Sequence, residues 1–162
     1  MTGAATAPRS AEEQARFESA MVETFERRIP FNAVLGLKVL SLKPGDVRLR
    51  FEMKPDLVGA YNFGRLHGGA ICTALDALSG MALIVAVAER HPGETALQVM
   101  QRSARMGTID LRVDFLRQGL GAWFDASGDV LRLGGRVGSV HSRLVNDQGE
   151  LIATATASFI VS

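Results

Sequence analysis

The chain has 162 residues, of which 22% are charged and 47% are hydrophobic, and its formal net charge is +1. This length fits one domain with a substantial core. The near-neutral charge disfavours a nucleic-acid-binding protein, because such proteins carry a pronounced basic surface. The single cysteine, Cys72, excludes a disulfide within the chain and is typical of a reducing compartment. We therefore expect a cytoplasmic globular protein without a nucleic-acid partner.

The N-terminal segment predicts a short lead followed by a helix. The first ten residues are rich in Ala and Thr and lack the apolar core of a signal peptide. We expect residues 1–9 to form a disordered lead and residues 10–162 to form a single domain. Ser10 and Glu13 have the spacing of a capping box. The apolar residues that follow at four-residue spacing are Phe17, Met21 and Phe25. The helix should end near residues 27–28, before Pro30.

A pair of antiparallel strands is predicted next. Residues 37–42 are moderately apolar, and residues 43–46 contain a Pro-Gly turn signal. Residues 47–53 alternate between apolar and polar side chains, as in a strand with one buried face. We expect residues 54–67 to form a loop that leads into the next element.

Residues 69–88 are almost entirely apolar or small, and they contain one charged residue, Asp76. One helical stripe holds apolar side chains at the spacing of a helix packed on a sheet: Ile71, Leu75, Leu78, Ala82 and Val85. About 20 apolar residues would also suffice for a membrane span, but Thr73, Ser79 and the amphipathic strands favour a buried core helix. An unpaired carboxylate in such a helix costs several kcal/mol. Asp76 therefore has a partner or serves chemistry.

The Gly68-Gly69 pair at the start of this helix leaves the first amide N–H groups unobstructed. A helix N-terminus carries partial positive charge and unpaired donors, which suit a carbonyl oxygen that becomes negative in a transition state. Asp76 lies eight residues further on, about 12 Å along the axis. One chain therefore cannot bring its own amide and its own carboxylate to the same atom. Two antiparallel helices from two subunits could do so, which favours a dimer with two shared sites.

The second half of the chain is predicted to be mainly strands. Residues 94–106 form an insertion whose Met and Arg side chains either contact a ligand or belong to a solvated loop. From Thr108 to Phe115 the period is two, with Ile109 and the later odd-numbered residues on one face and Thr108 on the other. Strands are expected at about 122–133, 136–145 and 151–161, with a hairpin at 146–149. The alternating alanines of the last strand should pack against the central helix.

Metal and thiol chemistry are not indicated. Around His67, His91 and His141 the sequence offers no second ligand at metal-binding spacing, so we expect no metal and no cofactor. Cys72 lies among small helical residues and has no histidine at a helical contact spacing. We expect it to serve packing rather than nucleophilic catalysis.

The start of the central helix resembles the signature motif of a known family. The run His67-Gly68-Gly69, with Asp76 nine positions after the histidine, resembles the signature of hotdog-fold acyl-CoA thioesterases of the phenylacetate-pathway (PaaI-like) type and their medium- and long-chain relatives. Residues 108–115 are similar to the strand that follows the helix in that family. The resemblance covers about residues 30–162. It implies an α+β hotdog fold, in which a curved antiparallel sheet wraps around one long helix, here with an extra N-terminal helix.

The resemblance also implies a function and a homodimer or dimer of dimers. The expected reaction is hydrolysis of medium-chain, long-chain or aromatic acyl-CoA to the free acid and CoA, at a site shared between two subunits. Asp76 would act as general base or as nucleophile. The N–H of Gly68, together with Gly69, would polarise the carbonyl.

Further residues receive roles from the same resemblance. His67 would orient the loop or take part in catalysis, and Thr108 would position the attacking water. Asn62 would donate a hydrogen bond, although relatives often carry Asn or Gln six positions before the histidine, where this chain has Tyr61. The residues expected to contact the substrate are Phe63, Arg65, Gly69 and Arg117. Arg117 ranks first among the arginines that would bind the phosphates of CoA.

Two other functions use the same fold. A hotdog enoyl-CoA hydratase or dehydratase would pair a histidine with a carboxylate in a different arrangement. A non-catalytic acyl-CoA-binding protein would bind the thioester without releasing a thiol.

Overall fold

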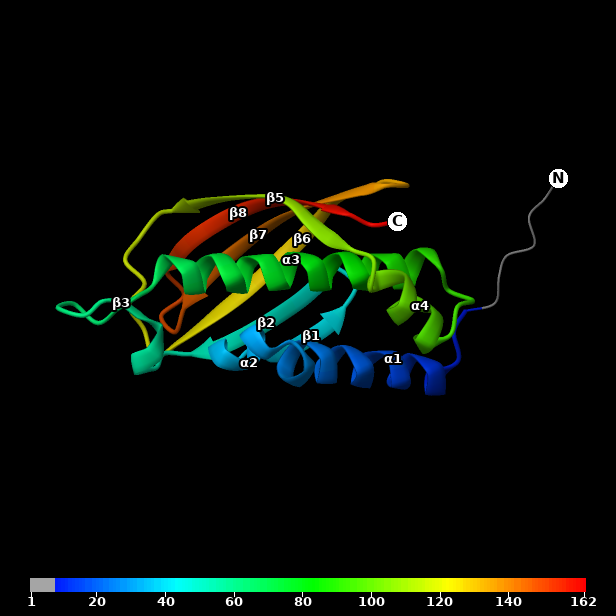
Figure 1. The fold of residues 1–162 in the computed structure, drawn as a ribbon, viewed down its shortest axis with the longest axis horizontal. Helices are drawn as coiled ribbons and strands as arrows, with labels where there is room; N and C mark the ends of the chain where they lie inside the picture. The colour runs from blue at the N-terminus through cyan, green and yellow to red at the C-terminus, as the bar shows by residue number, and fades with distance from the viewer. Residues whose placement is uncertain (1–7) are drawn as a thin grey trace.

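The computed structural model describes residues 8–162, so most of the predicted N-terminal lead lies outside the described part of the chain. Its elements follow one another as drawn in Figure 1. The helical elements are α1 (Ala11–Glu23), the π-helical turn η1 (Thr24–Arg28), α2 (Pro30–Leu35), the 3-10 turn η2 (Pro55–Leu57), α3 (Gly68–Arg90) and α4 (Ala96–Ser103). The strands are β1 (Lys38–Lys43), β2 (Asp46–Glu52), β3 (Val58–Ala60), β4 (Arg65–Leu66), β5 (Gly107–Phe115), β6 (Trp123–Leu133), β7 (Val137–Asn146) and β8 (Leu151–Ile160).

The main sheet has six strands in the order β1-β2-β6-β7-β8-β5, and every neighbouring pair is antiparallel. Figure 1 shows the sheet curving behind α3, with α1 and α2 running along the side of β1. This arrangement is the predicted hotdog architecture with an extra N-terminal helix. The strand β5 forms one edge of the sheet, and its outer side has no neighbouring strand among residues 8–162.

The helix α3 is the centre of the core. The predicted stripe from Ile71 to Val85 is buried against the sheet, and Ala74, Leu75 and Leu78 are completely covered. The helix is long and apolar enough to cross a membrane, but 67% of its most apolar window is buried inside the protein. Burial against the sheet therefore accounts for its composition. The alanines of β8 are buried as well, as expected for the surface that receives α3.

The N-terminal arm begins as the sequence predicts. The Ser10 side chain accepts a hydrogen bond from the Glu13 N–H at 3.2 Å. The reciprocal half of the predicted capping box is not formed, because the Glu13 carboxylate accepts from the Ala96 N–H of α4 at 2.9 Å. Residues 30–35, expected as a turn, form the helix α2. It ends at Gly36, whose φ of 76° suits glycine at a helix C-terminus.

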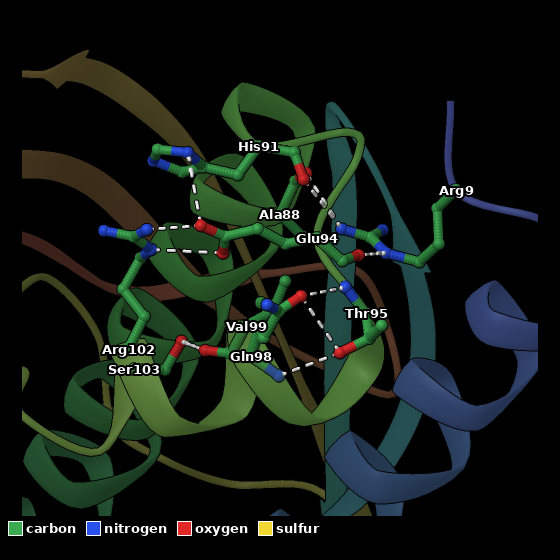
Figure 2. A network of polar contacts seen from close by, with 9 residues as sticks. All are labelled: Arg9, Ala88, His91, Glu94, Thr95, Gln98, Val99, Arg102 and Ser103. Atoms are coloured by element: carbon green, nitrogen blue, oxygen red, sulfur yellow. Dashed lines mark hydrogen bonds and ion pairs between the residues drawn. The ribbon is translucent and has the colours of Figure 1, made fainter. Parts of the chain in front are cut away.

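The insertion at residues 94–106 is not a solvated loop, and its Ser103 and Met106 line the cavity that also contains Asp76. It forms α4, which opens with a complete capping box of Thr95 and Gln98 and buries Val99 completely. Figure 2 shows how this region is connected. Arg102 forms an ion pair with Glu94, and its hydrogen bond lowers the pKa of Glu94 below the ordinary value.

Arg9, which the sequence analysis assigned to the disordered lead, joins the same network. Its guanidinium donates to the carbonyl oxygens of Ala88 at 3.1 Å and Glu94 at 2.9 Å (Figure 2). The described end of the lead is therefore tied to the C-terminus of α3 and to the start of α4.

The predicted loop at residues 54–67 is also structured. It contains η2 and a small hairpin made of β3 and β4, which projects beyond the N-terminus of α3 (Figure 1). The Leu66 N–H donates to the Gly119 carbonyl at 2.9 Å, so this hairpin is joined to the segment after β5.

Candidate active site

The carboxylate of Asp76 has a hydrogen-bond partner. The Thr108 hydroxyl donates to Asp76 Oδ1 at 2.8 Å and thereby joins the middle of α3 to the start of β5. Both residues line a cavity of about 340 Å³. The apolar side chains around it come from the N-terminal arm, α3, β8 and the residue before β5: Phe25, Ile29, Phe31, Ile84, Met106 and Phe159. Asp76 is thus a half-buried acid at the wall of an apolar cavity, as a general base or nucleophile requires.

The side of β5 that carries Thr108 differs from the prediction. Simple alternation placed Thr108 on the face opposite Leu111 and Val113. In the structure Thr108 pairs with Phe159 and Asp110 pairs with Ser158, so that Ile109 is an extra residue in the ladder. This β-bulge changes the phase of the strand. Thr108 therefore faces α3, whereas Ile109 is 59% exposed.

The N-terminus of α3 is capped by His67. Its Nδ1 accepts a hydrogen bond from the Gly69 N–H at 2.8 Å, so the imidazole occupies one of the amide donors at the helix end. A side chain at Gly69 would lie 2.9 Å from Nδ1, and one at Gly59 would lie 2.7 Å from His67 Cα. Both positions require glycine because His67 packs so closely. This geometry supports the orienting role of His67.

Only one backbone N–H group at the N-terminus of α3 remains available to donate a hydrogen bond to a ligand. The N–H groups of Ala70 and Ile71 both donate to the His67 carbonyl, and Gly69 donates to the imidazole. The Gly68 N–H forms no hydrogen bond with any residue that the structure describes. The sequence-based pair of Gly68 and Gly69 as carbonyl donors is therefore reduced to Gly68.

A second cavity of about 400 Å³ borders this helix end. It is lined by His67, Gly69, Asp56 and Val34, and it shares Phe31 and Thr73 with the Asp76 cavity. The hollow surface therefore continues along α3 from its N-terminus to Asp76. The distance along the axis between Gly68 and Asp76 remains about 12 Å, since the helix is continuous between them. A single carbonyl group cannot contact both within one chain.

The other predicted site residues lie at the end of the molecule where α3 begins. Asn62 and Phe63 are exposed in the turn of the β3–β4 hairpin, away from both cavities. Arg65 stacks on Phe63 with its guanidinium carbon 4.3 Å from the ring centroid. Arg117 is exposed and donates to the Leu151 carbonyl at 3.1 Å. Within one chain none of these four residues approaches Asp76, and their roles stay predictions.

Neither the Cys72 thiol nor the arrangement of the described metal-ligating side chains indicates thiol or metal chemistry. Burial raises the pKa of the Cys72 thiol, which makes a reactive thiolate less accessible. Among residues 8–162 no group of three or more His, Cys, Asp or Glu side chains is placed to hold a metal ion.

The sequence analysis overlooked two residues, one at the N-terminus of α3 and one at the Asp76 cavity. Phe115, at the end of β5, lies over the N-terminus of α3, where a side chain at Gly68 would be 3.5 Å from its ring. Asn32, in α2, lines the Asp76 cavity although it is 4% exposed. No sequence signal marked Asn32, because residues 30–35 were expected to form a turn and the extended Ile29 separates α2 from the helix before it.

Three features together indicate the class of protein to which this chain belongs. They are the fold, the capped glycine at the start of the central helix, and the acid paired with a hydroxyl. Residues 63–153 match the family described as the thioesterase superfamily, and the chain belongs to that family.

Particular relatives agree with this assignment. The chain is 39% identical over 139 residues to the medium/long-chain acyl-CoA thioesterase YigI of Salmonella typhimurium, an alignment that covers 86% of this chain and 90% of the relative. A solved structure from Shewanella oneidensis related to the thioesterase superfamily is 34% identical, with a TM-score of 0.87, and covers 94% of this chain and all of its own. The PaaI protein of E. coli, at 17% identity and a TM-score of 0.70, shares the fold over 94% of this chain and 95% of its own.

Proposed function

We propose that the protein hydrolyses medium- or long-chain acyl-CoA thioesters to free acid and CoA. The observation that carries this proposal is the Asp76–Thr108 pair at the wall of an apolar cavity. A volume of about 340 Å³ equals that of about eleven water molecules at about 30 Å³ each, which is space for an acyl chain of medium length. The activity named for the YigI relatives points to the same substrates.

Each subunit would contribute a different part of the reaction. Asp76 would activate a water molecule or attack the carbonyl carbon directly, and the Thr108 hydroxyl would hold one carboxylate oxygen while the other faces the substrate. The N–H of Gly68 of the partner subunit would stabilise the negative charge on the carbonyl oxygen. Arg65 and Arg117, both near the N-terminus of α3, would bind the CoA phosphates.

The edge strand β5 supports a homodimer of this kind. The backbone groups on its outer side have no partner strand among the described residues. Two side chains of β5, Ile109 and Phe115, are 59% and 55% exposed. Such an edge is a template for pairing with another chain. In an isologous, antiparallel pairing of two β5 strands, the start of one strand lies beside the end of the other. Thr108 contacts Asp76 and Phe115 lies over Gly68. The pairing would therefore bring the acid of one subunit to the helix N-terminus of its partner.

The first test is thiol release from acyl-CoAs of increasing chain length and from phenylacetyl-CoA. The wild-type protein should release thiol fastest from medium or long aliphatic chains. Asp76→Asn should keep the fold, because the Thr108 hydroxyl can still donate to the amide oxygen, and should lose most turnover. Full activity in Asp76→Asn would remove Asp76 from the mechanism. Hydration of an enoyl-CoA, or tight binding without thiol release, would favour one of the two other functions.

A second test asks whether the site is shared. Gly68→Pro removes the N–H, and proline is compatible with the first position of a helix. The preceding His67 has φ −66° and ψ 135°, which proline allows in the residue before it. Asp76→Asn and Gly68→Pro should each be inactive alone. After refolding as an equal mixture they should recover about a quarter of the wild-type activity, because half of the dimers then contain one intact site.

No recovery in a mixture shown to form hybrid dimers would contradict the shared site. A sedimentation measurement that finds a monomer at assay concentrations would contradict the shared site directly. We also infer that the enzyme works in the cytoplasm, since its single cysteine suits a reducing compartment.

A further inference from the structure

The Asn32 side chain is a buried polar group that the rest of the chain does not satisfy. Asn32 is 4% exposed, and its Nδ2 is buried and has no hydrogen-bond partner among the described residues. Its backbone carbonyl is engaged, because it accepts from the N–H groups of Gly36 and Leu37. A buried N–H without an acceptor costs about 1–3 kcal/mol. An apolar side chain of the same size would be more favourable here, unless an occupant of the cavity supplies the acceptor.

The other polar side chains around this cavity have no hydrogen to offer. The Thr73 hydroxyl donates to the Gly69 carbonyl and the Ser103 hydroxyl donates to the Val99 carbonyl, each at 2.8 Å. The Thr108 hydroxyl donates to Asp76. Among the described residues that line the cavity, Asn32 therefore carries the side-chain donor left for a bound molecule. Because Nδ2 itself is buried, the donor role requires the carboxamide to turn about its Cβ–Cγ bond, which exchanges Nδ2 and Oδ1 without movement of α2.

The proposed reaction brings a hydrogen-bond acceptor to this place. The Gly69 N–H is bound by His67, so a helix N-terminus offers the thioester only the Gly68 N–H. Asp76 must lie close to the carbonyl carbon, and the carbonyl oxygen is about 1.2 Å from that carbon. Every substrate therefore brings one acceptor oxygen into the cavity that Asp76 and Asn32 both line.

We propose that the Asn32 carboxamide donates a hydrogen bond to the carbonyl oxygen of the thioester, as a second donor beside the N–H of Gly68 of the partner subunit. The inference rests on the proposed thioesterase function and adds a catalytic residue from the subunit that supplies Asp76. Donors of this kind act by stabilising the charge that develops on the oxygen in the transition state.

The variant Asn32→Leu tests the proposal, because it removes the donor and keeps the number and branching of the side-chain heavy atoms. We expect kcat for octanoyl-CoA to fall about 100-fold or more, with little change in KM and the same loss for phenylacetyl-CoA. The melting temperature should stay the same or rise, since an unpaired amide has been removed. Ser142→Ala is the matched control: its buried hydroxyl accepts a hydrogen bond from Ser79 away from the cavity, and activity should remain near that of the wild type.

A spectroscopic measurement separates this role from a structural one. Octanoyl-CoA with an isotope-labelled carbonyl would be bound to the slow variant Asp76→Asn and examined by infrared difference spectroscopy. The carbonyl band should move to higher frequency when Asn32→Leu is added, because the carbonyl oxygen loses a hydrogen bond. An unchanged band would overturn the proposal.

The remaining outcomes are equally decisive. Wild-type kcat in Asn32→Leu, or a loss confined to KM, overturns the role of Asn32 while the thioesterase function stands. A wild-type protein that releases no thiol from any acyl-CoA overturns the proposed function itself. Asn32→Asp keeps the shape but replaces the N–H group by an acceptor oxygen, so it should lose at least as much activity. Full activity in Asn32→Asp overturns the proposal even where Asn32→Leu fails to fold.

Discussion

Replacing Thr108 by valine tests the partner of the proposed catalytic acid most directly. Valine keeps the shape of threonine and removes the hydroxyl that donates to Asp76 Oδ1 at 2.8 Å. A hydrogen bond to a charged group contributes about 1.5–3 kcal/mol. If this energy holds the carboxylate in its reactive orientation, its loss lowers kcat by about 10- to 150-fold, since about 1.4 kcal/mol corresponds to a factor of ten. KM should change little, because the hydroxyl is occupied by Asp76 rather than by the acyl chain.

The assay is steady-state thiol release from octanoyl-CoA, with unfolding in urea measured on the same preparations. Thr108→Ser retains a hydroxyl at the bulge and should keep most of the activity. Valine also suits a strand, so the stability of Thr108→Val should remain near that of the wild type. Equal kcat values for the valine and serine variants would refute the reasoning, since the hydrogen bond would then contribute nothing to the orientation of Asp76.

Two predictions concern stability. A Cβ at Gly138 would lie 2.5 Å from Leu83 Cδ2 in the core, so Gly138→Ala should lower the unfolding free energy by about 1–3 kcal/mol and Tm by several degrees. Gly135 has open space around it, and Gly135→Ala should be neutral or slightly stabilising; similar Tm values for both would contradict the packing argument. Burial raises the pKa of Glu26, but the Val39 N–H and a lysine outweigh this and hold it below the ordinary 4.5. The stability that Glu26 adds should be complete above pH 4.5 and should disappear as the pH falls through its pKa in the folded protein. Urea unfolding of Glu26→Gln and wild type should therefore converge at low pH, and a pH-independent difference would refute the linkage.

Much of the fold follows from local patterns. The strands β2, β6, β7 and β8 were predicted to within a few residues because their alternation persists over seven or more positions. The helix α3 was predicted from a long run of apolar residues, and Asp76 stood out because it is the charged residue within that run. These features depend on neighbours along the chain.

Several errors arose where distant contacts decide the structure. The hairpin of β3 and β4 has very short strands, and it is held by a hydrogen bond from Leu66 to Gly119. The helix α4 was missed for a different, local reason: the capping box of Thr95 and Gln98 was present in the sequence but was not recognised. The Glu13 carboxylate accepts a hydrogen bond from the backbone of α4 instead of forming the predicted bond within its own capping box.

The sequence by itself determined which chemical groups the candidate site contains: a carboxylate at Asp76, a glycine pair at a helix N-terminus and a threonine at a strand start. The tertiary structure decided which of them can act together. A one-residue bulge turns Thr108 to Asp76, and the His67 cap occupies one of two amides. The folding of α2 against α3 places the unpaired amide of Asn32 in the same cavity as the acid. Strand phase, cap occupancy and helix docking all depend on contacts between segments far apart in the chain, and no local pattern of residues encodes them.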